Sequence, residues 1–131
     1  MRAMLLAAVA LAATPALAGG GDPAAAATAW AKLVDQGRYG ESWRQAGALF
    51  RNGVTKAGWA QMVGRVRQPL GVVVSRRLTS QARSRSLPGA PDGDYDTLHF
   101  ATVFTHKSSA VETIVLAREP SGWRVDGYFI R

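Results

Sequence analysis

The segment YDTLHFATVFT, residues 95–105, decides the fold class, because its side chains change character with a period of two. One set of alternate positions is mainly large and apolar and consists of Leu98, Phe100, Thr102 and Phe104. The positions between them hold His99, Ala101, Val103 and Thr105. This alternation is typical of a β-strand that buries one face. The segment therefore predicts a strand whose phenylalanine side chains face a core.

Further strands are predicted on both sides of this one. A β-branched run over residues 72–79 can continue through the polar stretch 81–86 as an exposed strand, and two more strands are predicted over residues 110–118 and 123–130. Residues rich in turn formers separate the four strands, and they lie at 87–94, 107–109 and 119–122. Strands that follow one another through short turns favour an antiparallel sheet.

The chain before residue 71 predicts helices instead, because its apolar residues recur every three or four positions. Asp22 is suited to cap a first helix with Pro23 at its first position, and Gly37 is suited to end it. A second helix is predicted from Tyr39 to Phe50, with glycines at positions 40 and 47 as its weak points.

A third helix is predicted to begin after Thr55, which can cap it, and to end near Pro69. Helices that precede an antiparallel sheet predict an α+β fold, in which the N-terminal helices pack on one face of a sheet of about four strands. We expect the sheet to be curved around a helix, because four Trp and four Phe provide bulky side chains for its concave face. These aromatic residues are expected to form the core.

Residues 1–18 have the pattern of a cleavable signal peptide. Arg2 supplies a positive start, residues 4–13 form an apolar run, and Ala16-Leu17-Ala18 is a small-x-small cleavage site. The run is shorter than the about 20 residues of a transmembrane helix, so no transmembrane anchor is expected after cleavage. The predicted organisation is a signal peptide over 1–18, a flexible lead over 19–22 and a single α+β domain over 23–131.

Several kinds of chemistry lack the residues that they need. The chain has no Cys, which excludes thiol catalysis and Cys-based metal sites, and it has only two His. It has neither a phosphate loop nor a Gly-x-Ser-x-Gly motif. We therefore expect no metal and no cofactor.

Five stretches of the domain carry a family resemblance. They are Gly37-Arg38-Tyr39 with Ser42-Trp43, residues 67–71 leading to Ser75-Arg76, the loop of residues 87–95, Phe104-Thr105-His106-Lys107 with Glu112-Thr113, and the ending 123–130. Together they resemble the bacterial domain-of-unknown-function family 4019. The resemblance implies a small exported protein of Gram-negative bacteria with a cystatin-like, nuclear-transport-factor-like cone fold. It implies no catalytic residues.

Positive charge is concentrated in the middle of the chain. Nine Lys and Arg and no acidic residue lie between Glu41 and Asp92, and the net charge is +6 once residues 1–18 are removed. A candidate anion-binding face on or beside the first strand consists of Arg76, Arg77, Arg83 and Arg85. The alternative is a solvated arginine-rich surface. For an exported protein, anionic lipids or polymers of the cell envelope are more suitable partners than nucleic acid.

Glu112 is the strongest candidate for acid-base chemistry. It is in phase with Ile114 and Leu116, so it is expected to face the interior, where a carboxylate needs a partner such as Arg67, Arg76 or Lys107. The candidate pocket or ion pair consists of Glu112, Arg67, Arg76, His99, Trp43 and Tyr128. A structural ion pair and a proton carrier are both open. His99 is in phase with Ala101 and Val103, on the face opposite Phe100 and Phe104, so it is not expected to meet His106.

Two functions follow from these observations. The favoured one is a non-catalytic exported domain that binds an apolar or anionic ligand, or an unknown envelope protein. The alternative is an enzyme of the lyase or isomerase type, which would use Glu112 or a His in a pocket. An open cavity that exposes Glu112 or His99 would favour the enzyme, and a filled one the binding domain.

The signal peptide makes a direct prediction about the mature protein. After expression in a Gram-negative host, the protein should occur in the periplasmic extract, or in the medium, and begin at Gly19. N-terminal sequencing and the intact mass of the purified protein measure this. An uncleaved chain that stays in the cytoplasm would contradict both the cleavage site and the periplasmic or secreted location.

Overall fold

The computed structural model describes residues 21–131. The predicted signal peptide, its cleavage site after Ala18 and the first two residues of the predicted lead lie outside the described residues. The elements in chain order are α1 (Pro23–Asp35), α2 (Tyr39–Gln45), α3 (Ala48–Gly53), α4 (Lys56–Arg67), the 3-10 helix η1 (Gln68–Leu70), β1 (Val73–Ser84), β2 (Tyr95–Phe104), β3 (Lys107–Glu119) and β4 (Gly122–Ile130). None of the described helices is long and apolar enough to span a membrane.

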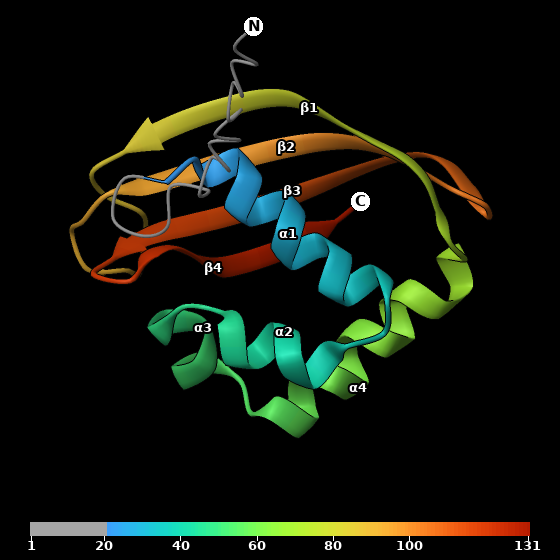
Figure 1. Ribbon diagram of the computed structural model, residues 1–131, viewed down its shortest axis with the longest axis horizontal. Helices are drawn as coiled ribbons and strands as arrows, with labels where there is room; N and C mark the ends of the chain where they lie inside the picture. Colours follow the sequence, from blue (N-terminus) through green and yellow to red (C-terminus); the bar gives the residue numbers. More distant parts are fainter. Residues whose placement is uncertain (1–20) are drawn as a thin grey trace, which may run out of the picture.

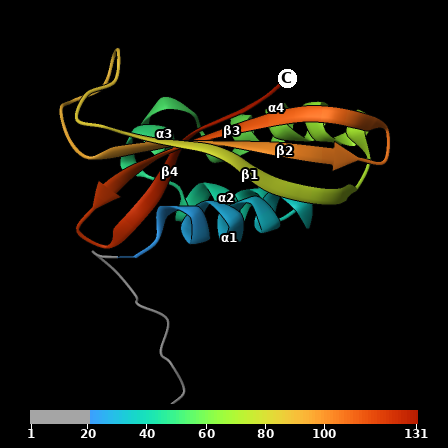
Figure 2. The same cartoon turned by 90° about the horizontal axis from the view of Figure 1, so that it is seen from above.

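The four strands form one antiparallel sheet in the order β1-β2-β3-β4, which confirms the predicted α+β fold. Buried and half-exposed residues alternate along β2 and along the middle of β3, as the period of two predicts. The sheet is curved, and α1 crosses its concave side while α2, α3 and α4 gather near β4 (Figures 1 and 2). The polar continuation of the first strand is also confirmed, since β1 extends to Ser84.

Two predicted helix starts depend on local hydrogen bonds. The Asp22 carboxylate accepts a hydrogen bond from the backbone N–H of Ala24 at 3.0 Å, and the Thr55 hydroxyl accepts one from that of Gly58 at 3.0 Å. Each satisfies a donor that the first helical turn leaves free. The starts of α1 and α4 are therefore determined by neighbouring residues, which is why the sequence predicted them.

The prediction of one helix from Tyr39 to Phe50 is wrong, because the chain leaves the helix at Ala46 and Gly47 and starts again as α3. Both residues are extended, and the Gly47 N–H donates to the Val125 carbonyl of β4 at 2.7 Å. Carboxylates of distant residues then accept hydrogen bonds from the backbone N–H groups at the start of α3. Glu119 accepts from the N–H of Ala48, and Asp126 accepts from that of Phe50. Contacts with β4 thus outweigh local helix propensity.

The predicted turn over 107–109 is also wrong, since the hairpin turns at Thr105 and His106 and β3 begins at Lys107. The turn is held by the last residue of η1 and by the segment after it. The N–H groups of Thr105 and His106 donate to the carbonyls of Val72 and Leu70, at 2.8 and 2.9 Å. Gly71, with φ of 78°, permits this close approach, because an added Cβ would lie 2.0 Å from the Thr105 hydroxyl.

Aromatic side chains join the helices to the sheet, as expected for a core. Trp30 of α1 lies with its ring centroid 5.3 Å from that of Tyr128 and 5.8 Å from that of Trp59. Ser42 of α2 satisfies both indoles, since its carbonyl accepts from Trp30 Nε1 at 2.8 Å and its hydroxyl from Trp59 Nε1 at 2.9 Å. Buried indoles need such partners, so α2 fixes where α1 and α4 meet.

The break before α3 can be tested with an alanine substitution. A Cβ at Gly47 would lie 2.1 Å from Asp126 Oδ1 and 2.8 Å from Glu119 Oε2, so Gly47→Ala must displace the carboxylates that start α3. We expect a loss of about 1–3 kcal/mol in the free energy of unfolding, measured by urea denaturation.

Gly53→Ala is the matched control, because nothing lies within 4 Å of its added Cβ. It should be neutral or stabilising by up to about 1 kcal/mol. Equal stability of the two variants would mean that the contacts of Glu119 and Asp126 with the start of α3 do not stabilise this helix.

Candidate functional site

A cluster of buried and half-buried polar side chains lies between the C-terminal half of α1, α4 and the concave face of the sheet. Its members, called here the Arg76 network, are Asp35, Arg67, Arg76, Thr102, Glu112 and Tyr128. Two arginines face two carboxylates, so the charges balance within the network. Four of the six candidate pocket residues predicted from the sequence come together here.

Arg76 of β1 is the centre of the network. Its Nη1 and Nη2 donate to the two carboxylate oxygens of Asp35, at 2.8 and 2.9 Å, and its Nε and Nη2 donate to those of Glu112, at 2.7 and 3.2 Å. A planar guanidinium can satisfy two carboxylates in this way. Arg76 therefore ties the end of α1 to β3, and its side chain reaches across the intervening strand β2.

Glu112 of β3 has no exposed surface, and all its interactions are internal. Oε1 accepts from Arg76 and from the Thr102 hydroxyl, while Oε2 accepts from Arg76 and from the Tyr128 hydroxyl. With four donors directed at two oxygens, the carboxylate is fully satisfied. Glu112 thus has the role of a structural ion pair in this geometry.

Arg67, at the last position of α4, is the second cation of the network. Its Nη2 donates to Asp35 Oδ1 at 2.9 Å, and its guanidinium carbon lies 5.0 Å from the centre of the Phe104 ring. Its buried Nε has no hydrogen-bond partner among the described residues. Asp35 therefore joins both arginines, and Asp35 and Arg67 lie near the 105–106 turn.

The charges in the network shift the pKa values of its members. Burial alone would raise the pKa of Asp35, but hydrogen bonds and charge from Arg76 and then Arg67 outweigh it and hold the pKa below its usual value. The stabilising contribution of Asp35 is thus complete above the pKa of an unfolded aspartate and is lost as the pH falls through the folded value. Burial, and then the Glu112 carboxylate, raises the pKa of Tyr128, which keeps its hydroxyl protonated as a donor.

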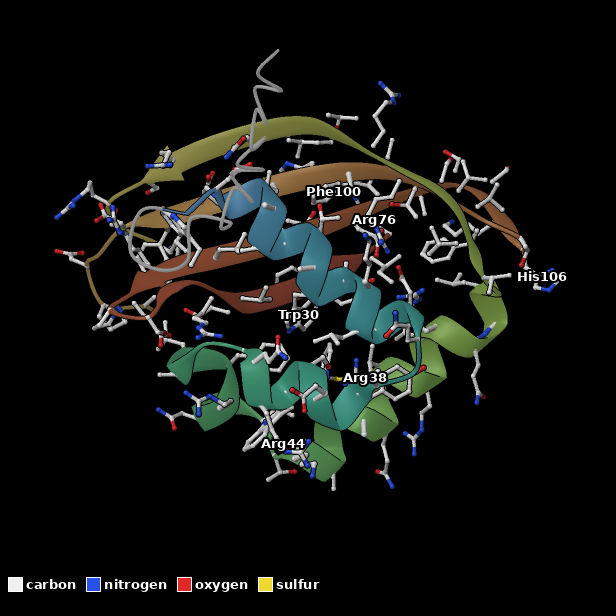
Figure 3. The ribbon with its side chains drawn as sticks, viewed as in Figure 1. Trp30, Arg38, Arg44, Arg76, Phe100 and His106 are labelled. Carbon is white, nitrogen blue, oxygen red and sulfur yellow. The ribbon has the colours of Figure 1, made fainter. Side chains whose placement is uncertain are left out.

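A groove of about 800 Å³ runs between α1 and the strands β1 and β2 and is called here the α1–β1 groove. Its apolar part is lined by Ala24, Ala25, Ala29, Leu33, Leu78 and Phe100. Its polar part is lined by Thr28, Lys32, Gln36, Arg38 and Arg76. Figure 3 shows Phe100 and Arg76 on the strands behind α1 and Arg38 beyond its C-terminal end. The cationic side chains therefore gather at the end of the groove that lies beside the C-terminus of α1, next to the Arg76 network.

The structure does not bring the four arginines of the candidate anion-binding face together. Arg76 is half-buried and is engaged in the network, whereas Arg77 is exposed and is the next residue of the strand, so it points to the opposite face of the sheet. Arg83 lies 3.5 Å from Asp96 and stacks at 4.9 Å on the Trp123 ring. Arg85 is paired with Asp94. Arg83 and Arg85 are thus each paired with an acidic residue at the start of β2 or just before it.

The two remaining candidate pocket residues lie apart from the network. His99 is on the outer face of the sheet, where its Nδ1 lies 2.8 Å from the Ser80 hydroxyl. Trp43 of α2 is half-buried against the core and donates from its indole to the Val54 carbonyl at 2.8 Å. Among residues 21–131 no group of three or more His, Asp or Glu side chains could hold a metal ion.

Asp35 and Thr102 are members of the network that sequence reasoning missed. Both have a signal in the sequence. Asp35 is a negative charge in the last turn of α1, where the helix dipole disfavours it. Thr102 is a hydroxyl on the apolar face of β2. A residue that conflicts with its local setting often has a distant partner, and here the partners are Arg76 and Glu112.

The role of Glu112 predicts a large loss of stability when its charge is removed. Glu112→Gln leaves Arg76 with one carboxylate and replaces one carboxylate oxygen by an amide NH2, which faces an Arg76 N–H and the hydroxyl of either Thr102 or Tyr128. We expect a loss of about 3 kcal/mol in the free energy of unfolding at pH 7, measured by denaturant titration.

Glu41→Gln makes the same chemical change at a solvent-accessible ion pair of α2, and it should leave stability nearly unchanged because water screens this pair. Similar losses in the two variants would show that the Glu112 pair does not stabilise the fold.

Comparison with known proteins identifies a family. No curated protein and no solved structure matches the chain, so the expected cystatin-like cone stays a prediction. The family model described as "Protein of unknown function (DUF4019)" matches residues 26–128, which extend from α1 to β4 and include the whole Arg76 network. The chain therefore belongs to the DUF4019 family.

Proposed function

We propose that this domain is a non-catalytic binding module that holds an amphipathic anion in the α1–β1 groove. The ligand would have an elongated apolar body and a carboxylate or phosphate head. The observation that supports this proposal is the graded lining of the groove, which is apolar along α1 and β2 and cationic at the C-terminal end of α1.

The cations at that end differ in how far they are already neutralised. Arg76 has two carboxylates, Asp35 and Glu112, at hydrogen-bond distance. Lys32 and Arg38 have no ion-pair partner in the part of the chain that the structure describes. The unbalanced charge in the groove therefore comes from Lys32 and Arg38, and an anionic head would be placed between them and Gln36.

The apolar part of the groove suits a slender ligand. Its helical wall extends from Ala24 to Gln36, about 18 Å at 1.5 Å per residue, and its side chains include the small residues Ala25 and Ala29. Phe100 and Leu78 form the opposite wall. A single extended apolar chain would bury these surfaces, and this burial contributes about 25 cal/mol for each Å².

The burial of Glu112 supports binding over the lyase or isomerase alternative. A proton carrier must come within hydrogen-bond reach of its substrate, but Glu112 is inaccessible and occupied by four internal donors. His99 lies on the other face of the sheet. If the chain is exported as residues 1–18 predict, lipid head groups and anionic polymers of the envelope are the anions within its reach.

The groove can be tested with matched surfactant-like probes. Dodecyl phosphate should bind, and dodecyltrimethylammonium should not, because the two share an apolar chain and differ in the sign of the head group. Isothermal titration calorimetry measures both. Raising the salt concentration should weaken the phosphate binding, whereas equal binding of the two probes would contradict the proposal.

Arg38→Glu should weaken dodecyl phosphate binding about tenfold or more, equivalent to about 1.4 kcal/mol. Arg77→Glu is its matched control, because it makes the same charge change on the opposite face of the sheet and should leave affinity within about twofold. Ala29→Trp should abolish binding by filling the groove. Equal effects of the two arginine variants would indicate a general charge effect rather than a site.

A further inference from the structure

A second pocket, of about 410 Å³, lies where the end of α1 faces η1 and the 105–106 turn, and it is called here the η1 pocket. Figure 3 shows His106 at this end of the molecule, beside η1. Its volume is within the range of about 300–1,000 Å³ that is typical of small-molecule pockets. Its polar lining consists of Asp35, Arg67, Gln68, Thr105 and His106. The rest of the lining is formed by Val34, Tyr39, Gly71 and Val72.

The guanidinium of Arg67 has hydrogen-bond donors that no described residue uses. It donates to Asp35 at 2.9 Å, and its other hydrogen bond, to the Tyr128 hydroxyl, is long at 3.5 Å. Its Nε has no partner among residues 21–131. A guanidinium has five N–H donors, and unused donors are costly in a side chain that is only 6% exposed. An oxygen atom of a ligand in the η1 pocket would therefore stabilise Arg67.

Asp35 provides the opposite group, an acceptor, beside Arg67. Its Oδ1 accepts from Arg67 and Arg76, whereas its Oδ2 accepts only from Arg76 in the part of the chain that the structure describes. A carboxylate has about four acceptor sites, and the Asp35 side chain is 21% exposed. The η1 pocket thus places an incompletely used acceptor next to incompletely used donors.

The carboxylate and guanidinium charges around the pocket balance, and this balance selects the charge of the ligand. Asp35 pairs with Arg67 in the lining, and Arg76 pairs with both Asp35 and Glu112. An anion would meet the Asp35 carboxylate, and a cation would meet the Arg67 guanidinium. A neutral ligand with hydroxyl groups avoids both conflicts, because a hydroxyl can donate as well as accept.

We infer that the η1 pocket binds a neutral sugar. Two adjacent hydroxyl groups are held side by side on a sugar ring, so one would donate to Asp35 Oδ2 while its neighbour accepts from Arg67. Gln68 and His106, which are exposed at the rim, would bind further hydroxyl groups, and the C–H face of the ring would pack on Tyr39. This site is separate from the α1–β1 groove and does not depend on the function proposed for it.

The test uses the isotope-labelled mature chain and four neutral sugars, which are glucose, galactose, mannose and N-acetylglucosamine. Titration followed by two-dimensional NMR measures the affinity and locates the site. At least one sugar should shift the amide signals of Gly71, Thr105 and His106 in a saturable way. Its amino-sugar derivative, a cation, and its uronic acid derivative, an anion, should bind at least fivefold more weakly. No saturable shift with any of the four sugars, or equal affinity for the charged derivatives, would overturn the inference.

Two glutamine variants compare the pockets. Gln68 and Gln36 each directly follow a helix, and Gln68 lines the η1 pocket whereas Gln36 lines the α1–β1 groove. Gln68→Ala should weaken sugar binding at least fivefold, because it removes a hydrogen-bonding group from the rim, and Gln36→Ala should leave it within twofold. Equal effects of the two variants would overturn the inference. Gln68→Ala should leave dodecyl phosphate binding unchanged, and a loss of both ligands would overturn the separation of the two sites.

Discussion

The guanidinium of Arg76 holds together parts of the chain that are far apart in the sequence. It lies between Asp35 at the end of α1 and Glu112 in the middle of β3, and each carboxylate receives two of its hydrogen bonds. Each of these charges is costly to bury alone and acceptable only when the others are present. The position of the C-terminal end of α1 on the sheet therefore depends on this cation, while Trp30 fixes the middle of the helix in the core.

The placement of α1 in turn determines the open surfaces. α1 crosses the concave side of the sheet (Figure 1). The α1–β1 groove remains on one flank of this helix. On the other flank α2, α3 and α4 pack together but leave the end of β4 uncovered. The two regions differ in chemistry. The α1–β1 groove joins an apolar wall to the cations Lys32 and Arg38, whereas the hollows beside the end of β4 are lined mainly by apolar and aromatic side chains.

The strands and two of the helices were predictable because their signals are local. The period of two in residues 95–105 and the caps at Asp22 and Thr55 all appear in the structure. The two errors, the single helix over 39–50 and the turn over 107–109, have one cause. In each case hydrogen bonds from a segment more than 30 residues away, to Gly47 and to His106, fix the backbone. Local propensity contains no information about such partners.

The candidate site was predictable only in part for the same reason. The phase of Glu112 with Ile114 and Leu116 placed it inside and required a cation, but three cations were open, and the partner turned out to be Arg76. The four arginines of the candidate face look equivalent in the sequence. The fold separates them, since Arg76 and Arg77 point to opposite faces of the sheet and Arg83 and Arg85 meet acidic residues from the neighbouring strand or the loop before it.

The sequence by itself determined the α+β class, the order of helices and strands, the family and the inward direction of Glu112, because periodicity, caps and motifs are properties of neighbouring residues. Only the tertiary structure decided which charges neutralise one another and which stay free. Asp35 and Arg76 are 41 residues apart, and Arg76 and Glu112 are 36 apart. Ion pairs at such separations exist only after the chain has folded, and the cations that remain unpaired define where an anion can bind.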